Sequence, residues 1–208
     1  QLLIELQELA TKISDYSFHS TILFGIWTVH LSRLELKSCL KIALENVART
    51  SQGESKADEA SALVTLINSY IWTGDLKSAE KHLQQLEQIL SVHQIQLLDE
   101  TFYLFFAYLL ANEKCDFGAV SKLEETIRER IRSVDEPFIQ AVLYQAIAWV
   151  DFNNNNPDRL RESCAQLLEI SSKYNFVFYT AIGKIFQARY LQTEDSLLAE
   201  QTVKEGYD

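Results

Sequence analysis

Residues that interrupt regular secondary structure are scarce in this chain of 208 residues, which contains 6 glycines and 2 prolines. Both counts fall well below average usage. A β-sandwich or β-barrel requires many tight turns, and glycine and proline dominate such turns. The sequence is instead rich in Leu, Ala, Gln, Glu and Lys, which favour helices. We therefore predict an all-α fold of long helices joined by short turns.

Methionine is absent, and the sequence opens with Gln1. We therefore expect a processed chain or a fragment of a longer protein. Cysteine is also rare, and the three cysteines form no C-x-x-C pair of the kind that zinc sites use. We interpret all three as small helix-packing residues in a reducing, cytoplasmic compartment; they are Cys39, Cys115 and Cys164.

An excess of basic residues is missing, since 19 Lys and Arg stand against 29 Asp and Glu, for a net charge of −10. Nucleic-acid surfaces normally need a basic stripe that displaces phosphate counterions, so we expect no direct nucleic-acid binding. Long apolar runs are missing too. The longest, residues 102–111, has about half the length that a membrane span requires. We therefore expect no membrane insertion and interpret this run as core.

Motifs for phosphate or metal binding are also missing. The closest pair of glycines, Gly53 and Gly74, is too far apart for a glycine-rich phosphate loop. The four histidines form no H-E-x-x-H or Glu-x-x-His pattern. We expect His30 to be a packed, hydrogen-bonded core residue and His82 to lie on a solvated helix face.

Carboxylates occur in adjacent pairs, Asp99–Glu100 and Glu124–Glu125. Neighbouring side chains on a helix diverge, so we interpret both pairs as surface charge rather than as acid–base machinery. The sequence therefore predicts no catalytic residue, no metal and no cofactor.

What the chain does contain is a repeat. Residues 70–83, YIWTGDLKSAEKHL, end one helix, turn at a Gly-Asp pair and begin a second helix with Ala79. Steps of 40 residues from Tyr70 and Ala79 reach similar pairs, namely His30 and Cys39, Leu110 and Ala119, and Tyr190 and Ala199. In the fourth copy, NNNNPD (153–158) shifts the second helix by about one residue, to Leu160. This regularity predicts a helical repeat array.

Each copy can bury two faces. In the second copy the first helix carries an apolar stripe that includes Leu63, Leu66 and Tyr70. Gly74 can adopt the left-handed conformation that ends this helix, and Asp75 can cap the next one. One face then packs within the hairpin and another against the neighbouring hairpin.

We expect residues 1–208 to form a single repeat domain. Residues 1–13 are expected to be the second helix of a truncated repeat. The hairpins are expected at approximately 18–50, 57–92, 97–133, 136–174 and 176–208.

The second copy resembles the tetratricopeptide superfamily. The residues that match its motif are Leu63, Leu66, Tyr70, Gly74 and Ala79. It departs from the motif at Ile67, where the family has a small residue, and it lacks the terminating proline. In the other copies the turn glycine is replaced by Leu34, Lys114, Asn154 and Glu194. The resemblance implies a right-handed superhelical α-solenoid of about five such hairpins.

The 40-residue period exceeds the roughly 34 residues of the standard motif. Longer repeats of this kind look like those of MalT-like, LuxR-type transcription regulators and cyclase-linked signal-transduction ATPases, and LFGIWTVHLSRLELKSCLKIA (23–43) is similar to them. That resemblance implies a sensor or interaction arm, with the ATPase and DNA-binding parts elsewhere.

In such arrays the first helices line a concave groove. The repeat register predicts as groove residues Thr28, Asn68, Trp72, Tyr108, Tyr144, Phe152 and Lys184. Such a groove suits a protein, a peptide or a small apolar effector. Asn68 matches an asparagine that holds peptide in some family members, but only Lys184 remains of their basic clamp. The alternative is that neighbouring copies bury these side chains.

The leading functional hypothesis is a non-catalytic binding module, the sensor or interaction arm of a bacterial signalling protein. A stand-alone adaptor and an all-helical enzyme domain are the alternatives. Both ends of the array look open, so we also expect self-association.

Overall fold

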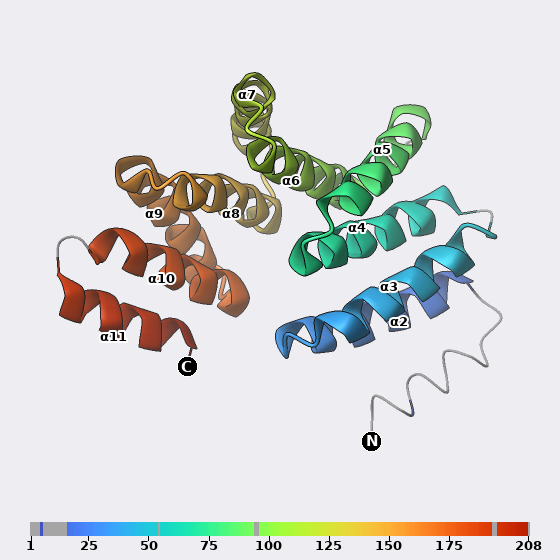
Figure 1. The fold of residues 1–208 in the computed structure, drawn as a ribbon, viewed down its shortest axis with the longest axis horizontal. Coiled ribbons are helices and arrows are strands. Elements are labelled where there is room, and N and C mark those ends of the chain that lie inside the picture. The colour runs from blue at the N-terminus through green and yellow to red at the C-terminus, as the bar shows by residue number, and fades with distance from the viewer. Residues whose placement is uncertain (1–4, 6–15, 54, 94–95, 193–194, 208) are drawn as a thin grey trace. The chain divides into compact units, whose positions relative to one another are not determined.

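The computed structural model describes residue 5 and residues 16–53, 55–93, 96–192 and 195–207. In this part of the chain there are ten α-helices and no strand, which confirms the predicted all-α class (Figure 1). The helices are α2 (Tyr16–Ser32), α3 (Leu36–Thr50), α4 (Lys56–Thr73), α5 (Leu76–Val92), α6 (Leu97–Glu113), α7 (Phe117–Ser133), α8 (Pro137–Asn153), α9 (Pro157–Lys173), α10 (Val177–Leu191) and α11 (Ser196–Tyr207). The helix expected at residues 1–13 lies outside the described residues, apart from Glu5.

The chain divides within α6 into two compact units, residues 1–106 and residues 107–208. In the first unit, α2 packs against α3 and α4, and α4 also packs against α3 and α5. In the second unit, α8 packs against α7, α9 and α10, and α10 also packs against α9 and α11. The consecutive helices α2 to α5 therefore lie side by side in the first unit, and α7 to α11 do so in the second.

The turn between α4 and α5 forms as its sequence predicts. Gly74 has a φ of 79°, in the left-handed region, and its N–H donates to the carbonyl of Ile71. The Asp75 side chain accepts a hydrogen bond from the backbone N–H of Ser78 at 3.1 Å, which caps α5.

Residues other than glycine occupy the left-handed position in the corresponding turns. Leu34 does so as expected, but Cys115 and Asn155 take the positions that the sequence assigned to Lys114 and Asn154. Cys115 is consequently exposed in a turn, so the prediction that all three cysteines pack inside helices is wrong for this one.

The core of the first unit is built where α2, α3 and α4 meet. Its buried members are Leu23, Ile26, Trp27, Cys39, Ile42, Ala43 and Leu66. The indole N–H of Trp27 donates to the Ser69 hydroxyl at 2.8 Å, so the polar atom of this ring is satisfied inside the core.

In the second unit α8 contributes many buried residues to the core, including Leu143, Ala146 and Ile147, each fully buried. Gly183 lets α10 approach α9 closely, because a Cβ at this position would lie 2.7 Å from Cδ2 of Leu168. The Cys164 thiol donates to the Gly183 carbonyl at 3.0 Å.

Residues 102–111 are core, as predicted, since most of their side chains are buried. No helix in the described ranges combines the length and apolar character that crossing a membrane requires.

Candidate functional site

Three of the predicted groove residues lie in the first unit, on the adjacent helices α2 and α4. Thr28 is exposed, and its hydroxyl donates to the Phe24 carbonyl at 2.9 Å. Asn68 is half-buried, and Trp72 is 41% exposed. Trp72 thus offers an indole surface to solvent, whereas the Thr28 hydroxyl is engaged within its own helix.

Three others lie on α8 and α10 in the second unit. Tyr144 is half-buried, and burial raises the pKa of its phenol. Phe152 is half-buried against Phe186, with 5.4 Å between ring centroids. Lys184 forms an ion pair with Glu205 at 2.7 Å, so its charge is already compensated. The predicted residues are therefore divided between the two units.

Tyr108, the seventh residue, is fully buried on α6 and exposes no ring surface to a ligand. Its hydroxyl donates to Oε2 of Glu124, on α7, at 3.1 Å. Tyr108 therefore follows the alternative given for the groove residues, namely burial within the array.

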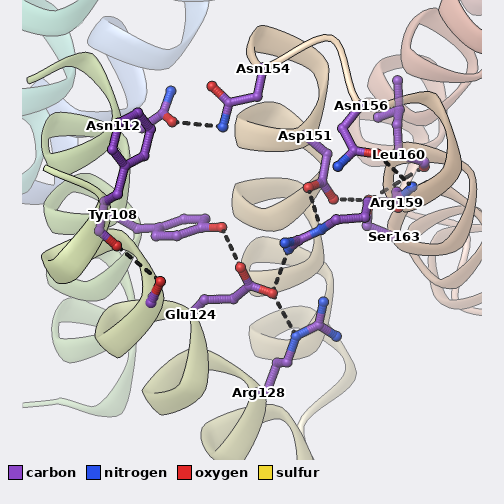
Figure 2. Close-up of polar contacts among 12 residues, drawn as sticks. Tyr108, Asn112, Glu124, Arg128, Asp151, Asn154, Asn156, Arg159, Leu160 and Ser163 are labelled. Atoms are coloured by element: carbon purple, nitrogen blue, oxygen red, sulfur yellow. Dashed lines mark hydrogen bonds and ion pairs between the residues drawn. The ribbon is translucent and has the colours of Figure 1, made fainter. Parts of the chain in front are cut away.

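Glu124 is the centre of a network of polar side chains that the sequence did not reveal. Figure 2 shows its carboxylate between Tyr108 on one side and the guanidinium groups of Arg128 and Arg159 on the other. Nη2 of Arg159 lies 2.6 Å, and Nε of Arg128 lies 2.9 Å, from Oε1 of Glu124. Burial alone would raise the pKa of Glu124, but these hydrogen bonds outweigh it and the pKa is lowered.

Arg159 continues the network to α8. Its Nε lies 3.1 Å from Oδ1 of Asp151, a carboxylate whose side chain is only 4% exposed. The Ser163 hydroxyl donates to Oδ2 of Asp151 at 3.0 Å, so both carboxylate oxygens have partners (Figure 2). Burial raises the pKa of Asp151, and Arg159 and Ser163 only partly offset this effect.

The network links four helices, α6, α7, α8 and α9. A pair of neutral amides lies beside it, where Nδ2 of Asn154 donates to Oδ1 of Asn112 at 2.9 Å (Figure 2). Each carboxylate of the network meets a guanidinium, so its charges are balanced internally. This arrangement suits the fixing of one hairpin against the next, because each link has a defined geometry.

The interpretation of the adjacent carboxylate pairs as surface charge is wrong for one member of each pair. The Glu124 side chain is 14% exposed, and Asp99 is 4% exposed. Asp99 accepts hydrogen bonds from the Ser61 hydroxyl at 3.1 and 3.2 Å. The sequence contained one usable signal for the network: Asp151 is a single carboxylate within the apolar stretch of α8.

An exposed aromatic cluster occupies the N-terminal ends of α8 and α10 in the second unit. Its members are Phe138, Tyr174, Phe176, Phe178 and Tyr179, whose rings contact one another at centroid distances of 5.3–6.4 Å. Three of these rings are substantially exposed: Phe138 at 38%, Tyr174 at 45% and Phe178 at 58%.

The histidines differ from one another in their surroundings. His30 is partly buried and bonds through Nδ1 to Glu35, in line with a packed, hydrogen-bonded role. His82 is not simply solvated, because its ring stacks on Tyr70 with 5.5 Å between centroids. Within the described ranges, no three His, Cys, Asp or Glu side chains are grouped so that they could hold a metal ion.

Comparison of the chain with protein-family models, with curated proteins and with solved structures finds no match.

Proposed function

We propose that this chain is a tetratricopeptide-like α-solenoid of about five hairpins that binds a protein, peptide or small effector without catalysis. The helix starts support the repeat. The first helices of successive hairpins begin at residues 16, 56, 97, 137 and 177, so at intervals of 40 or 41 residues. Equal spacing of packed hairpins is typical of repeat arrays, whose extended surfaces serve recognition.

The proposal that this chain binds a partner rests on the exposed aromatic cluster. Water-exposed rings gathered in one place are typical of surfaces that meet a partner, since monomeric proteins rarely leave large apolar patches open. Two exposed carboxylates, Asp135 and Glu136, precede Phe138 in the chain. With a net charge of −10, these groups favour a partner segment that combines apolar and basic side chains.

A peptide array tests this proposal. Peptides that combine apolar and basic residues should bind the intact chain saturably, and binding should weaken by about tenfold or more in Phe178→Ala. The matched control is Phe117→Ala, because Phe117 is also exposed, at 70%, but does not belong to the cluster. Equal binding by all three proteins would overturn the assignment of the cluster.

The groove is tested separately with Asn68→Ala and Trp72→Ala together, because Tyr108 is buried and would report on stability. If this double variant kept every interaction with peptides and small effectors, the groove assignment in the first unit would be wrong.

For the wider role, we propose the interaction arm of a bacterial signalling or transcription regulator, with a stand-alone adaptor as the second candidate. The resemblance of residues 23–43 to such regulators supports the first. Sequencing the whole gene distinguishes the two: an upstream P-loop and a downstream helix-turn-helix support the regulator, and their absence supports the adaptor. Turnover of any substrate by the purified chain would contradict both.

Self-association stays a prediction. Leu197 and Leu198 on α11 are 78% and 45% exposed, so an apolar surface is available there. Light scattering should show the apparent mass rising with concentration, and a strictly monomeric chain would contradict it.

A further inference from the structure

A shallow cavity of about 340 Å³, widely open to solvent, lies in the second unit beside α8, α10 and α11. Its lining residues are Phe152, Ile185, Ala188, Arg189, Gln192, Ser196, Ala199, Glu200 and Val203. This volume falls at the lower end of the range for small-molecule sites.

The apolar part of the lining includes an aromatic ring. Phe152 is held by its contact with Phe186, which is itself buried and meets Trp149 edge to face. Because the ring is fixed by neighbours, it can present a constant surface to a flat apolar ligand.

Arg189 supplies the polar part. Its Nη1 donates to Oε1 of Gln192 at 3.2 Å, and its Nη2 donates to Oδ1 of Asn155 at 3.1 Å. Both acceptors are neutral amides, and Arg189 forms no ion pair with a carboxylate among the described residues. The guanidinium is therefore oriented but not neutralised, and it keeps N–H donors beyond the two that are used.

The acidic groups nearby are engaged. Glu200, which also lines the cavity, pairs with Lys204 at 2.9 Å. Asp195 precedes Ser196 and accepts the backbone N–H groups of Leu197 and Leu198 at 3.1 and 3.0 Å, as a cap of α11. Of the two charged residues that line the cavity, Arg189 is the one that has no oppositely charged partner among the described residues.

We propose that this cavity binds a small organic monoanion, an aromatic or aliphatic carboxylate whose apolar body lies against Phe152 and whose carboxylate meets Arg189. A planar guanidinium matches a carboxylate in two parallel hydrogen bonds. The inference deepens the proposed function, on which it rests, by giving the chemical class of the effector.

Calorimetric titration of the full chain with three probes of one ring size tests the inference. The probes are 2-naphthoate, neutral 2-naphthol and cationic 2-naphthylmethylammonium. The naphthoate should bind about tenfold or more tightly than the naphthol, and the cation should bind weakest.

In Arg189→Gln the affinity for naphthoate should fall to that for naphthol, while naphthol binding stays unchanged. The matched control is Arg132→Gln, which changes an exposed arginine that donates to a backbone carbonyl and does not line the cavity. Val203→Trp, which fills part of the cavity, should weaken both probes.

Naphthoate binding that is absent, or that is equal in the parent and in Arg189→Gln, would overturn the inference. Such a failure is separable from failure of the proposed function, because the peptide test depends on Phe178 and not on the cavity.

Discussion

Arg159 and Glu124 form an ion pair, with 2.6 Å between Nη2 and Oε1, that joins α9 to α7. These residues are 35 positions apart in the sequence, and each belongs to the second helix of its hairpin. The pair therefore links successive hairpins through polar side chains, in addition to the apolar contacts along the helices.

Glu124→Ala should destabilise the second unit by about 1–3 kcal/mol, because it removes the acceptor of three hydrogen bonds and leaves the buried Tyr108 hydroxyl without its partner. This destabilisation is smaller than the loss expected on breaking a fully buried ion pair, because the Arg159 side chain is 45% exposed. Urea unfolding measures the change.

The control for this change is Glu125→Ala, which makes the same substitution at the exposed neighbour. It should alter the free energy of unfolding by less than about 0.5 kcal/mol. The gap between the variants should persist above pH 4.5, the ordinary pKa of a glutamate, and shrink as the pH falls through the lowered pKa of Glu124. Equal destabilisation by the two variants would contradict the role of the network.

Asp99 should make the first unit less stable as the pH rises from about 4 to 6. Burial raises the pKa of this carboxyl from 3.8 to about 6, against the opposing effect of the Ser61 hydrogen bond. Over that interval the folded state binds more protons than the unfolded state, so the free energy of unfolding falls, by about 3 kcal/mol in total.

Asp99→Asn should remove this decline and be more stable than the parent chain at pH 7. Asp135→Asn, at an exposed carboxylate, should leave the pH profile unchanged. Chemical unfolding at several pH values measures both. An Asp99→Asn variant that is less stable than the parent at pH 7 would show that the ionised carboxylate stabilises the fold.

Leu34→Gly should stabilise the first unit by about 1 kcal/mol. Leu34 has a φ of 56° and is 69% exposed, so glycine relieves a left-handed conformation while little packing is lost. Leu197→Gly, at an exposed helical position, should instead destabilise its unit by a similar amount. Thermal unfolding distinguishes the signs, and destabilisation by Leu34→Gly would contradict the turn geometry.

Gly183→Ala and Gly25→Ala should differ in their free energies of unfolding by about 1–3 kcal/mol. Both gain helix propensity, but a Cβ at Gly183 meets the Leu168 side chain at 2.7 Å, whereas a Cβ at Gly25 meets nothing within 4 Å. Gly25→Ala should therefore stabilise the chain. Equal shifts in the denaturation midpoint would mean that α9 and α10 do not approach as closely as described.

The all-α class and the Gly74–Asp75 turn could be predicted because they depend on local preferences. Few breakers favour helices, glycine accepts a positive φ, and aspartate caps the following helix. The interior role of residues 102–111 followed from their apolar character alone.

A strict spacing of 40 residues placed Tyr108 in the groove, but its side chain is fully buried. Its hydroxyl donates to Glu124 on α7, and the neighbouring Leu109 and Leu110 are buried as well, so this part of α6 belongs to the core in either register. The burial of Glu124 and Asp99 depended on distant partners, Arg159 and Ser61, which no local pattern identifies.

The central claim is that packed two-helix units support one another through their nearest neighbours. Residue-resolved hydrogen exchange of Phe186→Ala tests it most directly, because Phe186 on α10 is 5% exposed and contacts Trp149 and Phe152 on α8. A truncation of this kind costs about 3–5 kcal/mol in a packed core. We expect protection to fall most in α8, α9, α10 and α11, less in α7, and not at all in α2 to α4. An equal loss of protection in every helix would contradict the account.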